Sequence, residues 1–126
     1  MNATEIATVL VVEDAPSEMK LMRHYLQSEG FSVIGAMTGK EGLDKAIAQK
    51  PDVIVTDVVM PGGISGFELC RKLKHNPKTK EVPVVICSSK GQTIDRMWGM
   101  RQGAKAYLTK PYTRDQLIDA IRDVLT

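Results

Sequence analysis

Short runs of apolar residues alternate along the chain with longer segments of helical periodicity. Five of the runs are rich in β-branched residues and too short for helices, which predicts strands at Thr8–Val12, Ser32–Ala36, Val53–Asp57, Val84–Ser88 and Ala106–Thr109. Because these runs are apolar at nearly every position, we expect both faces of each strand to be covered, as in a parallel sheet.

The segments between the runs repeat apolar residues at spacings of three and four, which predicts amphipathic helices. Pro16 suits a first helical turn, and Gly30 stops the segment that follows it. Thr113 opens a segment that resembles a capping box. The predicted helices run from about 16 to 29, 39 to 48, 66 to 75, 93 to 102 and 113 to 125.

Alternation of five strands with five helices predicts the α/β class, with a doubly wound five-stranded parallel sheet and a single domain over residues 1–126. No linker, internal repeat or low-complexity segment interrupts the pattern. In such sheets, ligands bind beyond the carboxyl ends of the strands, near a topological switch point. The residues that follow the strands are therefore the place to look for function.

Composition excludes several classes of protein. The 126 residues are 43% hydrophobic and 25% charged, and the net charge of +2 is too small to indicate a nucleic-acid or membrane partner. The chain has no apolar run of roughly 20 residues and no signal peptide at its start. We therefore expect a cytoplasmic monomer, with Cys70 and Cys87 as small buried apolar residues.

One acidic residue stands inside an apolar stretch, at Asp57 in PDVIVTDVVMP. A buried carboxylate is costly unless it is neutralised, paired or bound to a metal. Glu13 and Asp14 end the first predicted strand, so parallel strands would bring three carboxylates to one edge of the sheet. Like charges repel, and oxygen ligands suit a hard cation, so magnesium is the expected ion.

A hydroxyl and an ammonium group follow the last two strands, at Ser88 and Lys110. Both can hold oxygen atoms of a phosphate, the hydroxyl by donating a hydrogen bond and the ammonium as a point charge. Asp57 is then the candidate nucleophile, which would form an aspartyl phosphate. The pattern predicts a phosphoryl-transfer site.

The chain resembles the receiver domain of two-component response regulators over essentially its whole length. The resemblance rests on VVEDAPSE, VTDVVMP, the serine that ends the fourth predicted strand, and YLTKP, in this order and spacing. It implies a flavodoxin-like, CheY-like fold. It also implies that a histidine kinase phosphorylates Asp57 and that the domain catalyses its own phosphorylation and dephosphorylation. The implied site comprises magnesium ligands at Glu13, Asp14, Asp57 and the Val59 carbonyl, with Ser88 and Lys110 binding the phosphoryl group.

The resemblance also implies a switch, in which phosphorylation pulls Ser88 inward and Tyr107 rotates from an exposed to a buried position. The fourth helix, fifth strand and fifth helix would then report the change to a downstream protein. The segment SSKGQTIDRMWGMRQGAKAYLTKP is similar to small stand-alone regulators of type IV pilus and chemotaxis-like motility systems. Within it, Met97 and Trp98 are candidates for the partner surface with Tyr107, and packing against the sheet is the alternative for both.

Three alternatives stay open on the sequence. The chain could be a docking module that works without phosphorylation, on the same fold, or a receiver fragment of a larger regulator. A nucleotide-binding or flavin-binding α/β protein is disfavoured, because the first strand is followed by neither GxGxxG nor GxxxxGK[ST]. The intact set of five polar residues at the strand ends favours the phosphorylated switch.

Overall fold

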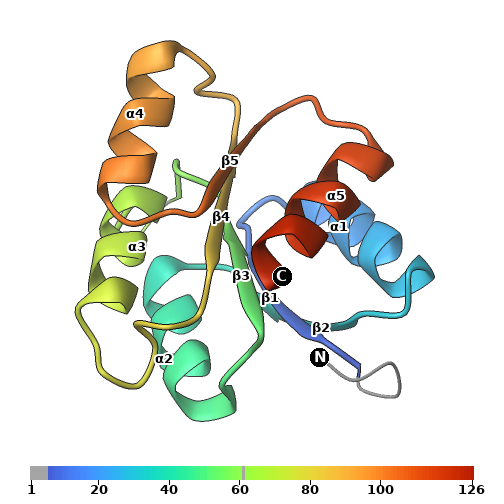
Figure 1. Ribbon diagram of the computed structural model, residues 1–126, viewed down its shortest axis with the longest axis horizontal. Helices are drawn as coiled ribbons and strands as arrows, with labels where there is room; N and C mark the ends of the chain where they lie inside the picture. Colours follow the sequence, from blue (N-terminus) through green and yellow to red (C-terminus); the bar gives the residue numbers. More distant parts are fainter. Residues whose placement is uncertain (1–5, 61) are drawn as a thin grey trace.

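A five-stranded parallel sheet in the order β2-β1-β3-β4-β5 forms the centre of the computed structural model, which describes residues 6–60 and 62–126 (Figure 1). The predicted α/β class, alternation and parallel sheet are confirmed. The strands are β1 (Thr8–Val12), β2 (Ser32–Ala36), β3 (Val53–Thr56), β4 (Val84–Ser88) and β5 (Ala106–Thr109). The helices are α1 (Pro16–Ser28), α2 (Gly39–Gln49), α3 (Gly66–Lys74), α4 (Thr93–Arg101) and α5 (Arg114–Leu125).

The predicted boundaries were wrong by about one residue at several ends. β3 stops at Thr56 rather than Asp57, because the Asp57 carboxylate accepts a hydrogen bond from the amide of Val58 (2.6 Å) and the chain turns out of the sheet. Helix α2 runs to Gln49, where Lys50 takes a left-handed conformation with φ of 48°. Helices α3 and α4 each end one residue earlier than predicted, and the predicted last residue serves as the cap.

The amino end of α5 confirms the capping box expected at Thr113. The Thr113 hydroxyl accepts a hydrogen bond from the amide of Gln116 (3.1 Å), and the Gln116 side chain accepts one from the Thr113 amide (2.9 Å). This pair satisfies two amides that the first helical turn leaves without a partner. The helix therefore begins at Arg114, one residue later than predicted.

Two apolar cores lie on opposite faces of the sheet. The first core lies on the face that helices α2, α3 and α4 cover, and the second core lies on the face that α1 and α5 cover (Figure 1). Alternate residues of β1 point to opposite sides: Leu10 belongs to the first core, and Val9 and Val11 belong to the second. Both faces are covered, so the strands need apolar residues throughout.

The chain order around the sheet reverses at β1, which pairs with β2 on one side and with β3 on the other. Connections leaving β1 and β3 therefore pass to different faces and leave a crevice at their carboxyl ends. Val12 pairs with Thr56 at this edge, so the residues that follow the two strands emerge side by side. None of the described helices is long and apolar enough to cross a bilayer.

Both cysteines are free and buried, as the sequence predicts, with Cys70 in the first core and Cys87 in the second. Burial raises the pKa of Cys70 to about 11 and that of Cys87 to about 12. Little thiolate exists near neutral pH, and reagents cannot reach either sulfur.

We expect a thiol-specific chromogenic reagent at about pH 8 to label the native protein about 100-fold more slowly than the urea-unfolded protein. The absorbance of the released dye gives both rates, and the unfolded sample serves as the control. Native labelling as fast as that of the unfolded chain would contradict the burial of both thiols.

Candidate functional site

Three carboxylates meet at the carboxyl ends of β1 and β3. One oxygen each from Glu13, Asp14 and Asp57 lies within 4.8 Å of the other two. The pairing of Val12 with Thr56 causes this, since Glu13 and Asp57 are the next residues of their strands. The amide of Asp57 also donates to the Val12 carbonyl (3.2 Å), which holds the two strand ends together. The predicted convergence of the three acids is present in the structure.

The Lys110 ammonium group lies among the carboxylates. Its Nζ is 3.1 Å from Asp57 Oδ2, 3.2 Å from Glu13 Oε2 and 3.0 Å from Glu18 Oε2. The Lys110 amide donates to the Ser88 carbonyl (2.9 Å), so β4 positions the residue, and the Lys110–Pro111 peptide is cis. The predicted approach of Lys110 to Asp57 is therefore observed.

Burial and charge act against each other at Glu13, whose side chain is 2% exposed. Burial is the largest cause that raises its pKa to about 7, and neighbouring Glu18 and Asp57 add to the rise, whereas Lys110 opposes it. At Lys110, burial alone would lower the pKa, but contacts with Glu18 and Asp57 and the charge of Glu13 outweigh it and raise the pKa above its usual value. A protonated Lys110 therefore partly neutralises the acidic group.

The donor set fits a hard divalent cation. Glu13, Asp14 and Asp57 offer only oxygen atoms, close enough together to share one ion, and magnesium favours such ligands. Val59 follows two residues after Asp57, with its side chain 60% exposed, in the turn that leaves the sheet. Its carbonyl remains a predicted ligand, since the carboxylate geometry does not test it.

Ser88 and Tyr107 are linked through Lys90. The fully buried Ser88 hydroxyl accepts a hydrogen bond from the Lys90 amide (3.2 Å), and the Tyr107 hydroxyl donates to the Lys90 carbonyl. The Tyr107 side chain is buried, at 8% exposure, with the Arg96 guanidinium 5.4 Å from its ring centre. Tyr107 thus points inward in this structure, and its predicted rotation stays a prediction.

A surface cavity of about 410 Å³ gives access to Asp57. It is lined by Glu18, Leu21, Asp57, Ser89, Lys110, Pro111 and Tyr112. Sequence reasoning missed Glu18 and Ser89, although each had a signal. Glu18 lies in the first turn of the helix that directly follows Glu13, and Ser89 is the second hydroxyl of a Ser-Ser pair at a strand end.

Two of the predicted partner-surface residues are exposed, Met97 to 65% and Trp98 to 49%. The alternative that they pack into the core is therefore wrong. Tyr107, the third predicted member, is buried in this structure because its hydroxyl is bonded to Lys90 and α4 covers its ring. It therefore does not contribute its side chain to the surface in this conformation.

The comparisons with known proteins agree with this geometry. The family described as response regulator receiver domain matches residues 9–122, a range that includes every candidate residue. The chain belongs to the response regulator receiver domain family. Membership of this family agrees with the five-stranded parallel sheet and with the order of the polar residues along the chain.

Similar receiver-containing proteins differ in length. The chain is 41% identical over 120 residues to protein PilH of Pseudomonas aeruginosa, covering 95% of this chain and 98% of PilH. It is 38% identical to the response regulator PleD of Caulobacter vibrioides, covering 94% of this chain but 26% of PleD. The solved chemotaxis response regulator CheY4 of Vibrio cholerae superposes with a TM-score of 0.89 at 31% identity, covering 95% of this receiver domain and 99% of CheY4.

Proposed function

We propose that this receiver domain is a phosphorylation-controlled switch, in which Asp57 accepts a phosphoryl group from a histidine kinase in a magnesium-dependent reaction. The observation that supports this best is the position of the Asp57 carboxylate, which contacts Lys110 at 3.1 Å and lies beside two further carboxylates. A docking module that works without phosphorylation has no need of this arrangement, nor of a cavity that opens onto Asp57.

Glu13, Asp14 and Asp57 would hold the magnesium ion, together with the Val59 carbonyl. Bound there, the ion supplies positive charge that offsets the repulsion between the carboxylates and an incoming phosphate. Glu13 must be deprotonated to act as a ligand, and its pKa is raised to about 7, so a proton competes with the metal ion for this carboxylate near neutral pH.

In the proposed transfer, an Asp57 carboxylate oxygen attacks phosphorus. The N–P bond of the kinase phosphohistidine breaks, and its electron pair returns to the imidazole ring. The Lys110 ammonium, already 3.1 Å from Asp57 Oδ2, would stay beside a phosphoryl oxygen and spread its charge. The Ser88 hydroxyl would donate to a second oxygen, and attack by water would later release phosphate.

The proposed output is a change in a protein-docking surface in motility or taxis signalling in the cytoplasm. Identity of 41% to PilH and the resemblance to a chemotaxis response regulator support this role. The downstream protein would dock on the face formed by α4, β5 and α5 of a monomer. Exposed Met97 and Trp98 on α4 favour a surface of this kind.

Glu18 gives a prediction on the rate of phosphorylation. Its carboxylate competes with Asp57 for Lys110 and adds negative charge to the cavity through which a phosphate must enter. We expect Glu18→Gln to increase the initial rate of phosphorylation by a small anionic phosphodonor about 3-fold to 10-fold, with a smaller gain at high salt. Asp119→Asn on α5 makes the same charge change away from the cavity and should leave the rate unchanged. An unchanged or slower rate in Glu18→Gln would rule out this role.

The fluorescence of Trp98, the single tryptophan, tests the switch itself. We expect a saturable change when magnesium and a small phosphodonor are added together, since α4 contacts Tyr107. The change should be absent in Asp57→Asn and in EDTA. If mass spectrometry shows full phosphorylation and the fluorescence of Trp98 does not move, the proposed coupling from Asp57 to α4 is wrong.

A further inference from the structure

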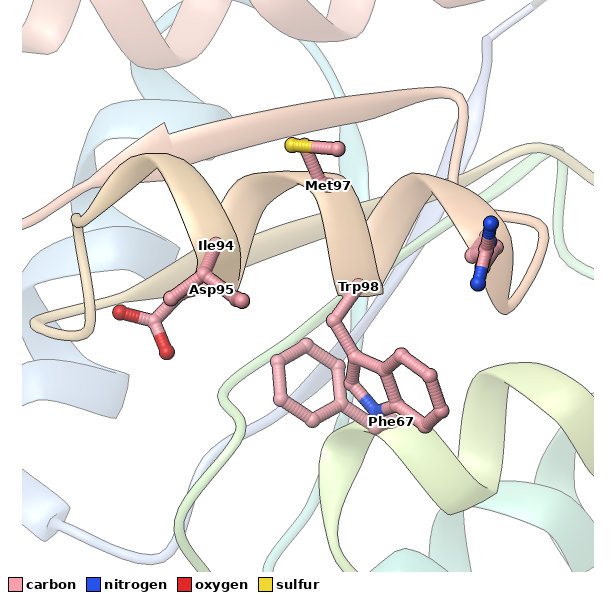
Figure 2. A pocket seen from close by; sticks show the side chains of 6 residues that line it. Phe67, Ile94, Asp95, Met97 and Trp98 are labelled. Carbon is pink, nitrogen blue, oxygen red and sulfur yellow. The ribbon is translucent and has the colours of Figure 1, made fainter.

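Helix α4 is attached to the sheet with little apolar burial. The buried residue of α4 is Gly99, whereas α5 buries four apolar side chains. The large apolar side chains of α4 lie outside: Met97 is 65% exposed, and Trp98 borders an open groove beside the Phe67 ring of α3 (Figure 2). A helix with few buried apolar contacts is displaced easily, so polar contacts carry more weight in fixing its position.

Arg96 supplies such polar contacts between α4 and β5. Its Nη1 donates to the Thr109 hydroxyl (2.8 Å), and its Nη2 donates to the Tyr107 carbonyl (3.2 Å). The guanidinium carbon also lies 5.4 Å from the centre of the Tyr107 ring, within the range of a cation–π contact. One side chain of α4 therefore contacts the ring and the carbonyl of one β5 residue and the hydroxyl of another.

The groups that Arg96 contacts on β5 are neutral. Arg96 forms no ion pair with any residue in the ranges 6–60 and 62–126. Its neighbour Asp95 accepts a hydrogen bond from the Gln92 amide instead, as part of the helix cap (3.1 Å). The rigid fork of guanidinium donors is thus aimed at the strand, which suits a side chain that fixes geometry rather than one that balances charge.

The two β5 residues that the guanidinium contacts also hold the loop between β4 and α4. The Tyr107 hydroxyl donates to the Lys90 carbonyl, and the Lys90 amide donates to the Ser88 hydroxyl (3.2 Å). Thr109 packs against the same loop, since a Cβ atom added at Gly91 would collide with its side chain. A chain of direct contacts therefore runs from α4 through β5 to the hydroxyl that is proposed to bind the phosphoryl group.

We propose that Arg96 is a positioning residue of the switch, which holds α4 on β5 and keeps Tyr107 turned inward before any phosphoryl group is attached. A ring that rotated outward would give up both the guanidinium contact and the hydroxyl bond to Lys90, so Arg96 shifts the equilibrium toward the inward conformation. The consequence for phosphorylation rests on the proposed function, in which a phosphoryl group on Asp57 favours the same inward conformation.

Nitration by tetranitromethane tests the position of Tyr107 without any phosphodonor. The chain has three tyrosines, and the half-buried Tyr25 and Tyr112 serve as internal references. Mass spectrometry of the digested protein gives a separate rate for each ring. We expect Arg96→Met to raise the nitration rate of Tyr107 about fivefold to tenfold and to leave the other two rates unchanged.

Matched variants separate the contact from the charge. Arg101→Met removes an exposed arginine from the same helix and should leave the Tyr107 rate unchanged. Thr109→Val removes the hydroxyl that accepts from Arg96 and should raise the Tyr107 rate about threefold. Adding Thr109→Val to Arg96→Met should raise it little further, because both substitutions remove the same bond. Circular dichroism shows whether each variant is folded.

Magnesium and a small-molecule phosphodonor extend the test to the switch. In Arg96→Met, phosphorylation should bring the nitration rate of Tyr107 most of the way back to that of the unaltered protein, because the phosphoryl group favours the inward ring. The fluorescence change of Trp98 on phosphorylation should be larger in Arg96→Met than in the unaltered protein, since more of the variant starts with the ring outward.

Two results would overturn the inference. One is an unchanged Tyr107 rate in folded Arg96→Met and Thr109→Val, and the other is an equal rise at all three tyrosines, which indicates general loosening rather than release of one ring. Intact mass measured on the same samples separates the two proposals. A rise at Tyr107 in Arg96→Met without phosphoryl uptake by the unaltered protein contradicts the proposed function alone, whereas phosphoryl uptake with an unchanged Tyr107 rate contradicts the role of Arg96 alone.

Discussion

Gly66→Ala is expected to destabilise the protein by about 3 kcal/mol or more, because no side chain fits at this position. A Cβ atom there would lie 1.8 Å from the carbonyl oxygen of Asp57 and 2.9 Å from the Cα of Val58. The Gly66 amide also donates to the Val58 carbonyl (2.8 Å), so α3 begins directly against the backbone of Asp57 and Val58. Urea unfolding followed by circular dichroism gives the loss of free energy.

Gly35→Ala in β2 is the matched control. Its added Cβ would meet the end of the flexible Arg23 side chain at 2.8 Å, which can move aside, so we expect a change within about 1 kcal/mol. Any Gly66→Ala protein that folds should also accept phosphate more slowly, since the Asp57 backbone must shift. Equal stability of Gly66→Ala and the unaltered protein would contradict the close packing of α3 against Asp57.

Lys110→Met is expected to lower the free energy of unfolding by about 2 kcal/mol near neutral pH in the absence of magnesium. The substitution keeps most of the side-chain volume but removes the ammonium that contacts Glu13, Glu18 and Asp57. Glu13 is nearly fully buried, so its carboxylate would lose its cation without gaining water. Added magnesium should stabilise the variant more than the unaltered protein, because the ion then replaces the missing charge.

The pH dependence of this loss follows from Glu13. Its pKa in the folded protein is raised to about 7, so lowering the pH through this value protonates the carboxylate and removes the repulsion that Lys110 offsets. The destabilisation by Lys110→Met should therefore shrink as the pH falls from about 7.5 to about 5. Unfolding experiments at both pH values, with and without magnesium, provide the measurement.

A surface ion pair provides the control for Lys110. Lys45 contacts Glu41 at 3.2 Å on α2, with both side chains about one-third exposed or more, and Lys45→Met should cost less than about 1 kcal/mol at either pH. If Lys110→Met were as mild as Lys45→Met at both pH values, the acidic group would not depend on Lys110 for its charge balance.

The sheet and the acidic group could be predicted from the sequence for one physical reason. Parallel strands buried on both faces require continuous apolar runs, so a polar residue such as Asp57 can only stand where a strand ends. All such ends lie at one edge of the sheet, which brings Glu13, Asp14 and Lys110 to the same place. The helix ends were less certain, because capping depends on backbone conformation, as at Lys50 with its positive φ.

Other parts of the site depend on tertiary contacts that no local pattern reveals. Glu18 contacts Lys110 only because the first turn of α1 and the segment that follows β5 come together in space, across 92 positions of sequence. Met97 and Trp98 are large apolar residues of α4, yet they lie outside the core. The reason is that Gly99, on the other side of the helix, occupies the contact with Tyr107. The sequence therefore left the role of Trp98 open between core and surface.

The measurement that tests the central claim most directly is the intact mass of the protein after incubation with magnesium and a small-molecule phosphodonor. Asp57→Asn and a sample with EDTA are run in parallel. The account predicts a gain of one phosphoryl group in the unaltered protein, and no gain in Asp57→Asn or in EDTA. An unchanged mass in folded protein, or an equal gain in Asp57→Asn, would contradict the claim that Asp57 is the phosphoryl acceptor.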